Sequence, residues 1–199
     1  MNHIIVGLAG KAGVGKDTVA KNFIQTFLDE GVAINGEAYY PNPKTFAFAT
    51  RLKEAASRVF DIPLYCFNDP KLKETEVEYW GLTPRQIAQM FGTESMRHVF
   101  GANFWVKVLA RQLETQLKLN THENTIVFIT DCRFDNEVEF VLEQTGMVVE
   151  VKRESFITTK STGHISENGI TYPLPILQND TVAEATQRLK EMIVERYTQ

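Results

Sequence analysis

Cysteine is scarce in this sequence of 199 residues. The two cysteines, Cys66 and Cys132, lie far apart and form no CxxC motif, so the sequence predicts neither a disulfide framework nor a zinc site. A basic N-terminal region followed by an apolar region and a cleavage site is also missing, which argues against a signal peptide. Both absences predict a chain that works in a reducing cytoplasm.

Long apolar runs and an excess of positive charge are missing as well. The longest apolar run, residues 4–10, is far shorter than the roughly 18 residues that a membrane span needs. Twenty-one Lys and Arg residues against 25 Asp and Glu residues give a net charge of −4. This balance argues against a protein that coats nucleic acid or an anionic membrane, so we expect neither as a partner.

The sequence shows no internal repeat, no low-complexity tract and no long linker, and its hydrophobic content of 43% suffices for a sizeable core. Strand and helix patterns alternate, which predicts an α/β fold of three layers with a mainly parallel sheet between helices. We expect one domain over residues 1–199, with an insert at about 61–119 and a lid-like loop at about 153–172.

Periodicity and capping residues place most elements. Strands are expected at residues 3–8, 45–48, 125–130 and 147–151, and helices at 16–30, 104–119 and 135–144. Thr50 is expected to cap a helix, and Thr83 followed by Pro84 to start another, which Gly92 would interrupt. Thr181 with Glu184 predicts the start of the last helix, and residues 61–81 are expected to be irregular.

The strongest local signal is the segment GKAGVGKDT at residues 10–18, between an expected strand and an expected helix. Glycines allow backbone N–H groups to face a polyphosphate, the helix N-terminus adds positive potential, and Lys16 can reach the phosphates. Asp17 stands where this motif usually has a hydroxyl residue, and Thr18 follows it, so both are candidate ligands of Mg²⁺, directly or through water. The alternative is a glycine-rich turn without a ligand; a dinucleotide fingerprint fits worse, because its third glycine would fall on Thr18.

A second polar group follows the expected strand at residues 125–130. Asp131 comes at its carboxyl end, in the crevice beside the glycine-rich loop, where a carboxylate can hold magnesium or its waters. Arg133 and Glu137 follow, and the arginine fork suits phosphoryl oxygens. The alternative is an exposed ion pair between Arg133 and Glu137 at the start of a helix, worth about 0.3–0.5 kcal/mol.

Segments along most of the chain resemble the deoxynucleoside monophosphate kinases of tailed bacteriophages, within the P-loop kinase superfamily. The resemblance is carried by GKAGVGKDT, FAFATRLKEAA, TPRQIAQMFGTESMRHVFGANFWV, ITDCRFDNEVE, HISENG and LQNDTVAEA. It implies a P-loop fold, ATP as co-substrate, Mg²⁺ as cofactor and a deoxynucleoside monophosphate as acceptor. A homodimer is plausible by this resemblance alone, and a phage protein would work in the host cytoplasm.

The resemblance also implies roles for particular residues. ATP would be bound by the glycine-rich loop and by the segment of Asn179 and Asp180, which would lie beside adenine. The expected ATP-binding residues are Lys11, Ala12, Gly13, Val14, Gly15, Lys16, Asp17, Thr18 and Asn179. The acceptor would be bound by Arg85, Gly92, Thr93, Trp105, Asp131, Arg133 and Glu137. The catalytic residues would be Lys16, Arg85, Asp131 and Arg133, and the ligands of magnesium Asp17, Thr18 and Asp131.

Two of these positions keep an alternative. Trp105 lines up with Leu109 and Leu113 at helical spacing, so a place in the core competes with stacking on the acceptor base. For Arg85, on the helix that Thr83 and Pro84 start, the alternative is a side chain that simply faces solvent. Gln86 follows it where the resemblance leads us to expect a second basic residue.

The expected activity is transfer of the γ-phosphoryl group of ATP to a deoxynucleoside monophosphate, which would supply deoxynucleotides for DNA synthesis. A kinase of another small phosphorylated acceptor is the nearest alternative. An ATP-gated switch or assembly factor is a second one, and it would bind ATP without acceptor-dependent turnover. A phosphate-binding module without activity would leave Asp131 and Arg133 without a role.

Overall fold

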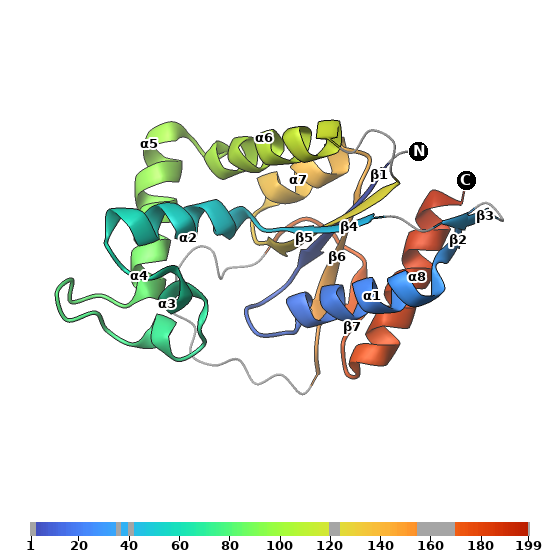
Figure 1. Cartoon of the computed structure of the whole chain (residues 1–199), viewed down its shortest axis with the longest axis horizontal. Helices are drawn as coiled ribbons and strands as arrows, with labels where there is room; N and C mark the ends of the chain where they lie inside the picture. Colours follow the sequence, from blue (N-terminus) through green and yellow to red (C-terminus); the bar gives the residue numbers. More distant parts are fainter. Residues whose placement is uncertain (1–2, 35–36, 40–41, 120–123, 155–169, 199) are drawn as a thin grey trace. The chain divides into compact units, whose positions relative to one another are not determined.

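The computed structural model describes residues 3–34, 37–39, 42–119, 124–154 and 170–198 (Figure 1). The chain folds as two compact units. The first consists of Met1–Ala47 and Leu113–Gln199, and the second is Phe48–Gln112. The insert expected at residues 61–119 overlaps most of the second unit. The lid-like loop expected at 153–172 lies mostly outside the described residues.

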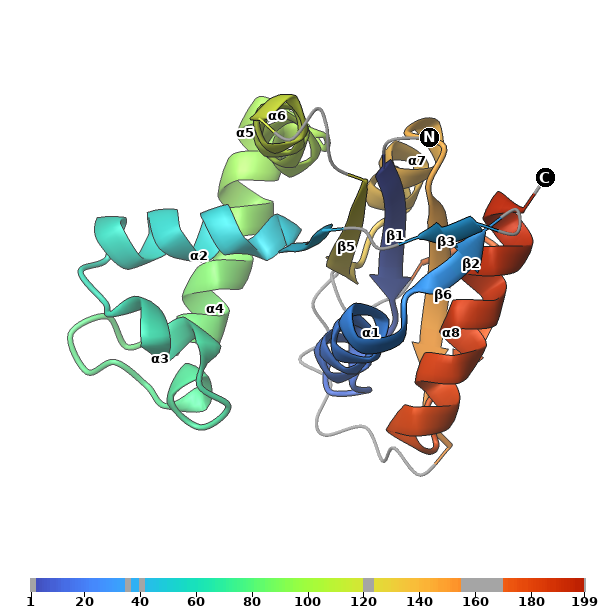
Figure 2. The ribbon, with the colours of Figure 1, turned by 45° about the vertical axis from the view of Figure 1, so that its right-hand side comes forward.

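A five-stranded sheet forms the centre of the first unit, with the strand order β4-β5-β1-β6-β7. Its three middle strands, β5, β1 and β6, are labelled in Figure 2. All four pairings in this sheet are parallel, so the expected α/β fold with a parallel sheet is confirmed. The strands are β1 His3–Ala9, β4 Asn42–Phe46, β5 Thr125–Cys132, β6 Met147–Lys152 and β7 Ile176–Gln178. Strands β1 and β5 are buried almost throughout, as expected for strands covered on both faces.

Helices cover both faces of this sheet. Helices α1 (Lys16–Glu30) and α8 (Val182–Tyr197) lie side by side on one face, where Phe23 and Leu189 join Ile4, Val6 and Leu8 of β1 in one core. Helix α7 (Asp135–Glu143) packs against β1 and β6 on the other face (Figure 1). A short hairpin of β2 (Val32–Ile34) and β3 (Glu37–Tyr39) follows α1.

The second unit is helical. Its core contains Ala56, Ile62, Phe67 and Ile87. The elements are α2 Phe48–Val59, α3 Leu64–Asn68, η1 Leu72–Glu74, α4 Pro84–Gln89, the π-helix η2 Met90–Arg97, α5 His98–Phe100 and the larger part of α6 Phe104–Leu119. Among the described residues, no helix of either unit combines the length and the apolar character needed to cross a bilayer.

Several helix boundaries agree with those predicted from the sequence. Helices at 16–30 and 104–119 have the predicted bounds. Thr83 caps α4, because its hydroxyl accepts a hydrogen bond from the N–H of Gln86, and Thr181 caps α8 in the same way. Residues 61–81 contain two short helices where irregular chain was predicted, and the hairpin and β7 were not predicted.

Two predictions about helix ends are wrong. Thr50 is no cap, because α2 already begins at Phe48. Gly92 does not interrupt its helix, which continues through η2. A Cβ atom at Gly92 would lie 2.2 Å from Cδ1 of Leu52, so the glycine allows α2 to approach closely. A glycine within a helix therefore marks a packing contact here and not a stop.

Candidate functional site

The loop between β1 and α1 has a backbone conformation that only glycine adopts easily at three of its positions. Gly10, Gly13 and Gly15 have φ angles of 123°, 86° and 96°. A Cβ atom at Gly10 would lie 2.5 Å from the carbonyl oxygen of Val151, and one at Gly15 would lie 2.5 Å from Nδ2 of Asn179. Glycine is therefore required at both ends of the loop, by conformation and by space.

The loop and the first turn of α1 form a place for an anion. Lys11, Ala12, Gly13, Asp17 and Thr18 are exposed. The first hydrogen bond of the helix runs from Val19 N–H to Gly15 O at 2.9 Å, and no side chain caps α1. The amides of residues 16–18 precede this bond, and such amides at a helix N-terminus bind phosphate groups.

Lys16 is the buried cation of this loop, and 8% of it is exposed. Its Nζ donates to the carbonyl oxygens of Gly10 at 2.7 Å and Lys11 at 2.9 Å. An ammonium has three N–H donors, so one remains for a phosphate oxygen. Burial, and next the charge of Arg133, lower the pKa of Lys16 to about 8, whereas Asp131 and Asp17 act in the opposite direction.

The end of β5 lies beside the loop. The register pairs Ala9, the last residue of β1, with Cys132 of β5. Asp131 and Arg133 are the neighbours of Cys132 in the sequence. The charges of Arg133 and Asp131 both act on the pKa of Lys16. The structure thus brings together Lys16, Asp131 and Arg133, as the sequence predicted.

Glu137 has a different surrounding from the one expected. It is 3% exposed, and its Oε2 accepts hydrogen bonds from the N–H of Arg133 at 2.8 Å and of Phe134 at 3.3 Å. The alternative of an exposed ion pair at this helix start is wrong, since the carboxylate is buried. These bonds fix the turn that carries Arg133, which gives Glu137 a positioning role.

Asn179 contacts the loop itself. It is 3% exposed, and its Nδ2 donates to the carbonyl oxygen of Val14 at 2.8 Å. A side chain with so little exposed surface offers adenine little to contact. The expected place of Asn179 beside adenine stays a prediction, and its contact with the loop was missed because β7, which leads to it, was not predicted.

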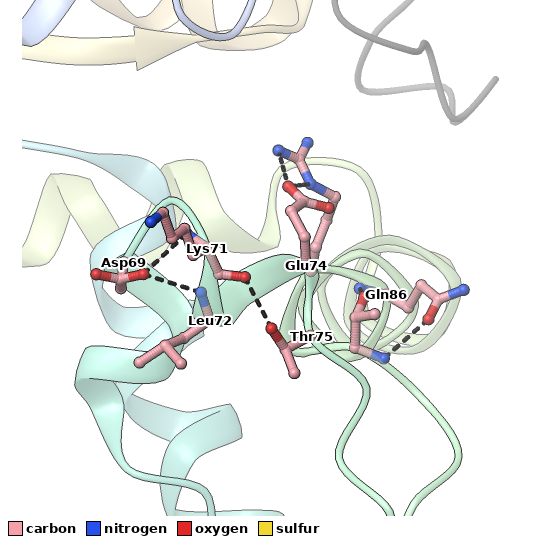
Figure 3. A network of polar contacts seen from close by, with 8 residues as sticks. Asp69, Lys71, Leu72, Glu74, Thr75 and Gln86 are labelled. Carbon is pink, nitrogen blue, oxygen red and sulfur yellow. Dashed lines mark hydrogen bonds and ion pairs between the residues drawn. The ribbon is translucent and has the colours of Figure 1, made fainter.

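Arg85 lies in the second unit. Its Nε and Nη2 both contact Oε1 of Glu74, each at 2.6 Å, and its side chain is 23% exposed (Figure 3). Glu74 was not among the predicted residues, because nothing in its local sequence pattern indicates a partner 11 residues away. Gln86, found where a basic residue was expected, acts locally, since its side-chain oxygen accepts from the N–H of Thr83 and completes the cap of α4.

Gly92, Thr93 and Trp105 are also in the second unit. Gly92 is buried and Thr93 is half-buried. Trp105 is 6% exposed, and its Nε1 donates to the carbonyl oxygen of Gly92 at 3.0 Å. Burial and this bond match the core alternative for Trp105, so the stacking role and the acceptor pocket stay predictions.

Asp135 is a further polar residue that the sequence analysis did not single out. At the start of α7, its carboxylate accepts hydrogen bonds from the hydroxyl and the N–H of Thr171 and from the N–H of Tyr172. The hydroxyl of Thr171 lowers the pKa of this carboxyl group most. Asp135 therefore fixes the segment that follows residue 169 to the helix beside Arg133.

The donors at the loop fit magnesium. Asp17, Thr18 and Asp131 offer oxygen atoms, and both carboxylates lie close enough to Lys16 to act on its pKa. Within the described ranges, no three His, Cys, Asp or Glu side chains form a metal cage. Mg²⁺ usually takes one or two carboxylates together with waters and substrate phosphates, so this donor set suits it.

Comparisons with known proteins give a family and a relative. A family model described as "Deoxynucleotide monophosphate kinase" matches residues 66–195. A protein of Acanthamoeba polyphaga mimivirus, provisionally described as a deoxynucleotide monophosphate kinase, is 26% identical over 205 residues, covering 91% of each chain. This relative comes from a giant virus, so the phage assignment stays a prediction. The crystal structure of a shikimate kinase from Bacteroides thetaiotaomicron matches with 14% identity and a TM-score of 0.35 over 96% of this chain and 98% of that one, too distant a likeness to carry an argument.

Proposed function

The chain belongs to the deoxynucleotide monophosphate kinase family, and on that premise we propose that it transfers the γ-phosphoryl group of ATP to a deoxynucleoside 5′-monophosphate. The products are the deoxynucleoside diphosphate and ADP, and the reaction supplies deoxynucleotides for DNA synthesis. If the phage-like resemblance holds, the reaction takes place in the cytoplasm of an infected host.

The observation that carries the proposal is the group of charges at the glycine-rich loop. Lys16 donates into the loop, and Arg133 and Asp131 act on its pKa from the end of the neighbouring strand. A loop that only bound phosphate would have no need of a second cation and a carboxylate at its edge. Phosphoryl transfer needs both, because charge develops on the transferred group while a metal is held beside it.

Positioning and charge neutralisation do the chemical work in this proposal. The acceptor is already a phosphate anion, so no general base is needed. The loop amides and Lys16 hold the phosphates of ATP, and the fork of Arg133 faces the equatorial oxygens of the transferred group. Glu137 keeps Arg133 in place through the two backbone bonds described above.

Mg²⁺, when bound through Asp17, Thr18 or Asp131, supplies positive charge to the phosphate oxygens. The acceptor roles of Arg85, Gly92, Thr93 and Trp105 rest on the family resemblance. For Arg85, the ion pair with Glu74 supports such a role, because it holds the guanidinium by the edge of Nε and Nη2 and so defines its orientation.

A panel of monophosphates with Mg²⁺ and ATP, scored by ADP release, tests the proposal. Deoxy and ribo forms of each base are measured side by side, together with small phosphorylated metabolites. We expect ADP release that depends on a deoxynucleoside monophosphate. Release with another phosphorylated metabolite only would give the chain a different acceptor. Tight ATP binding without any acceptor-dependent release would identify an ATP-gated switch instead.

A further inference from the structure

Asn179 is held in a defined place from two sides. It follows the last residue of β7, and its backbone N–H donates to the carbonyl oxygen of Lys152 at the end of β6, at 2.7 Å. Its side chain is buried, and Nδ2 donates to Val14 O at 2.8 Å. The phosphate-binding loop is therefore tied to the far edge of the sheet through one amide.

The geometry of the peptide bond gives this contact a consequence for the loop. The chain has no cis peptide bond among its described residues, and in a trans peptide the C=O and the N–H point in opposite directions. When Asn179 holds the carbonyl of Val14 on its own side, the N–H of Gly15 points to the opposite side of that peptide. Successive amides turned the same way form the concave surface that binds anions.

The fit between Asn179 and the loop is close. A Cβ atom at Gly15 would lie 2.5 Å from Nδ2 of Asn179, so the amide fills the space that a side chain would need. The other side-chain atom, Oδ1, is buried and has no hydrogen-bond partner among the described residues. An unsatisfied buried acceptor costs stability, which offsets part of what the Nδ2 bond to Val14 contributes to folding.

We propose that Asn179 is a positioning residue for ATP: by fixing the Val14–Gly15 peptide, it orients the phosphate-binding loop. It acts on the phosphates through the loop and contacts neither adenine nor the transferred group. This inference rests on the proposed binding of ATP phosphates by the loop. It differs from the adenine contact that the family resemblance predicts for the same residue.

Two ligands separate these roles. Magnesium tripolyphosphate has the phosphates without adenine, and ADP has both. Affinities of both are measured by calorimetric titration for the wild type and Asn179→Ala. We expect both ligands to bind at least about tenfold more weakly to the variant, which corresponds to about 1.4 kcal/mol. The KM for ATP should rise by a similar factor, and kcat should fall less.

Asn22→Ala is the matched control. Asn22 ties α1 to α8 through its Nδ2, which donates to Oγ1 of Thr186 at 2.9 Å, and this bond does not involve the loop. Thermal melting of both variants measures stability. We expect Asn22→Ala to bind both ligands as the wild type does. If the alanine variant at 179 does not fold, Asn179→Ser, which keeps a shorter donor, is measured in its place.

Two results would overturn the inference. Loss of affinity for ADP alone would mean that Asn179 contacts the base. Unchanged affinity for both ligands, with a lower melting temperature only, would mean a merely structural role. Neither titration uses an acceptor, so the result stands even if the monophosphate panel shows no kinase activity.

Discussion

The two units of the chain present their candidate residues in opposite ways. In the first unit, Lys16 is surrounded by loop carbonyls and by the charges of Asp131 and Arg133, and the geometry already suits a phosphate. In the second unit, Arg85 is paired with Glu74, and Trp105 donates to the carbonyl oxygen of Gly92. The candidate side chains there bond to other residues of their own unit.

This difference has a physical cause. A phosphate cradle is made by the backbone over a few consecutive residues, and its glycines, its lysine and its helix N-terminus are local features. An acceptor site is made by side chains from several helices, and each of these must first satisfy its own packing and hydrogen bonds. We propose that the loop of the first unit controls the binding of ATP. In the second unit, Arg85, Gly92, Thr93 and Trp105 would contribute to the binding of the acceptor.

Lys16→Met has the largest expected effect and tests the first half of this comparison. Methionine keeps the length of the apolar stem and removes the charge, so kcat should fall by about a hundredfold to a thousandfold. The melting temperature at pH 7 should rise, because the buried charge, whose pKa is lowered to about 8, no longer needs to be desolvated. Lys21→Met, on the exposed side of the same helix, is the control for both measurements. Near-normal turnover in Lys16→Met would remove the lysine from the site.

Arg133→Lys should lower kcat by about 10- to 100-fold with a small change in the KM for ATP, since charge is kept and the fork is lost. Steady-state kinetics measure both quantities. Arg188→Lys is the matched control, because Arg188 forms exposed ion pairs with Glu191 and Glu195 on α8. Equal kcat values for Arg133→Lys and the wild type would mean that the guanidinium fork of Arg133 takes no part in the reaction.

The pH dependence of activity and of stability also tests the charges around Lys16 in the first unit. Activity needs charged Lys16, so kcat/KM for ATP should fall as pH rises through about 8. Arg133 lowers the pKa of Lys16, so in Arg133→Gln this fall should move to higher pH. In the unfolded chain the lysine keeps its proton up to its ordinary pKa of 10.5, so the free energy of unfolding should increase between about pH 8 and 10.5. A flat pH profile, or a shift to lower pH in the variant, would contradict the assigned charges.

Gly92→Ala tests the second half and has the smallest expected effect. The added Cβ meets the end of the Leu52 side chain, which can shift, so the cost should be about 1–3 kcal/mol of stability. The KM for the acceptor should rise while the affinity for magnesium tripolyphosphate stays the same. The double variant Gly92→Ala with Leu52→Ala makes room and should recover part of the loss, which a double-mutant cycle measures. Weaker tripolyphosphate binding in Gly92→Ala would mean that a change in the second unit also affects phosphate binding in the first.

The sequence predicted what depends on local chemistry. The bounds of α1, the caps of α4 and α8 and the meeting of Lys16, Asp131 and Arg133 follow from glycines, capping residues and one buried parallel strand. Pairings between residues distant in sequence were not predicted. The contact of Asn179 with Val14, the ion pair of Glu74 with Arg85 and the close approach of Leu52 to Gly92 depend on tertiary packing, which leaves no periodic signal.

Transfer of a radioactive label from the γ-phosphate of ATP in a single turnover tests the central claim most directly. Wild type and Lys16→Met are each mixed with labelled ATP, Mg²⁺ and one deoxynucleoside monophosphate, and the products are separated. The account predicts that the wild type moves the label onto the deoxynucleoside diphosphate and that the variant leaves it on ATP. Label that appears only as inorganic phosphate, or equal transfer by both proteins, would contradict it.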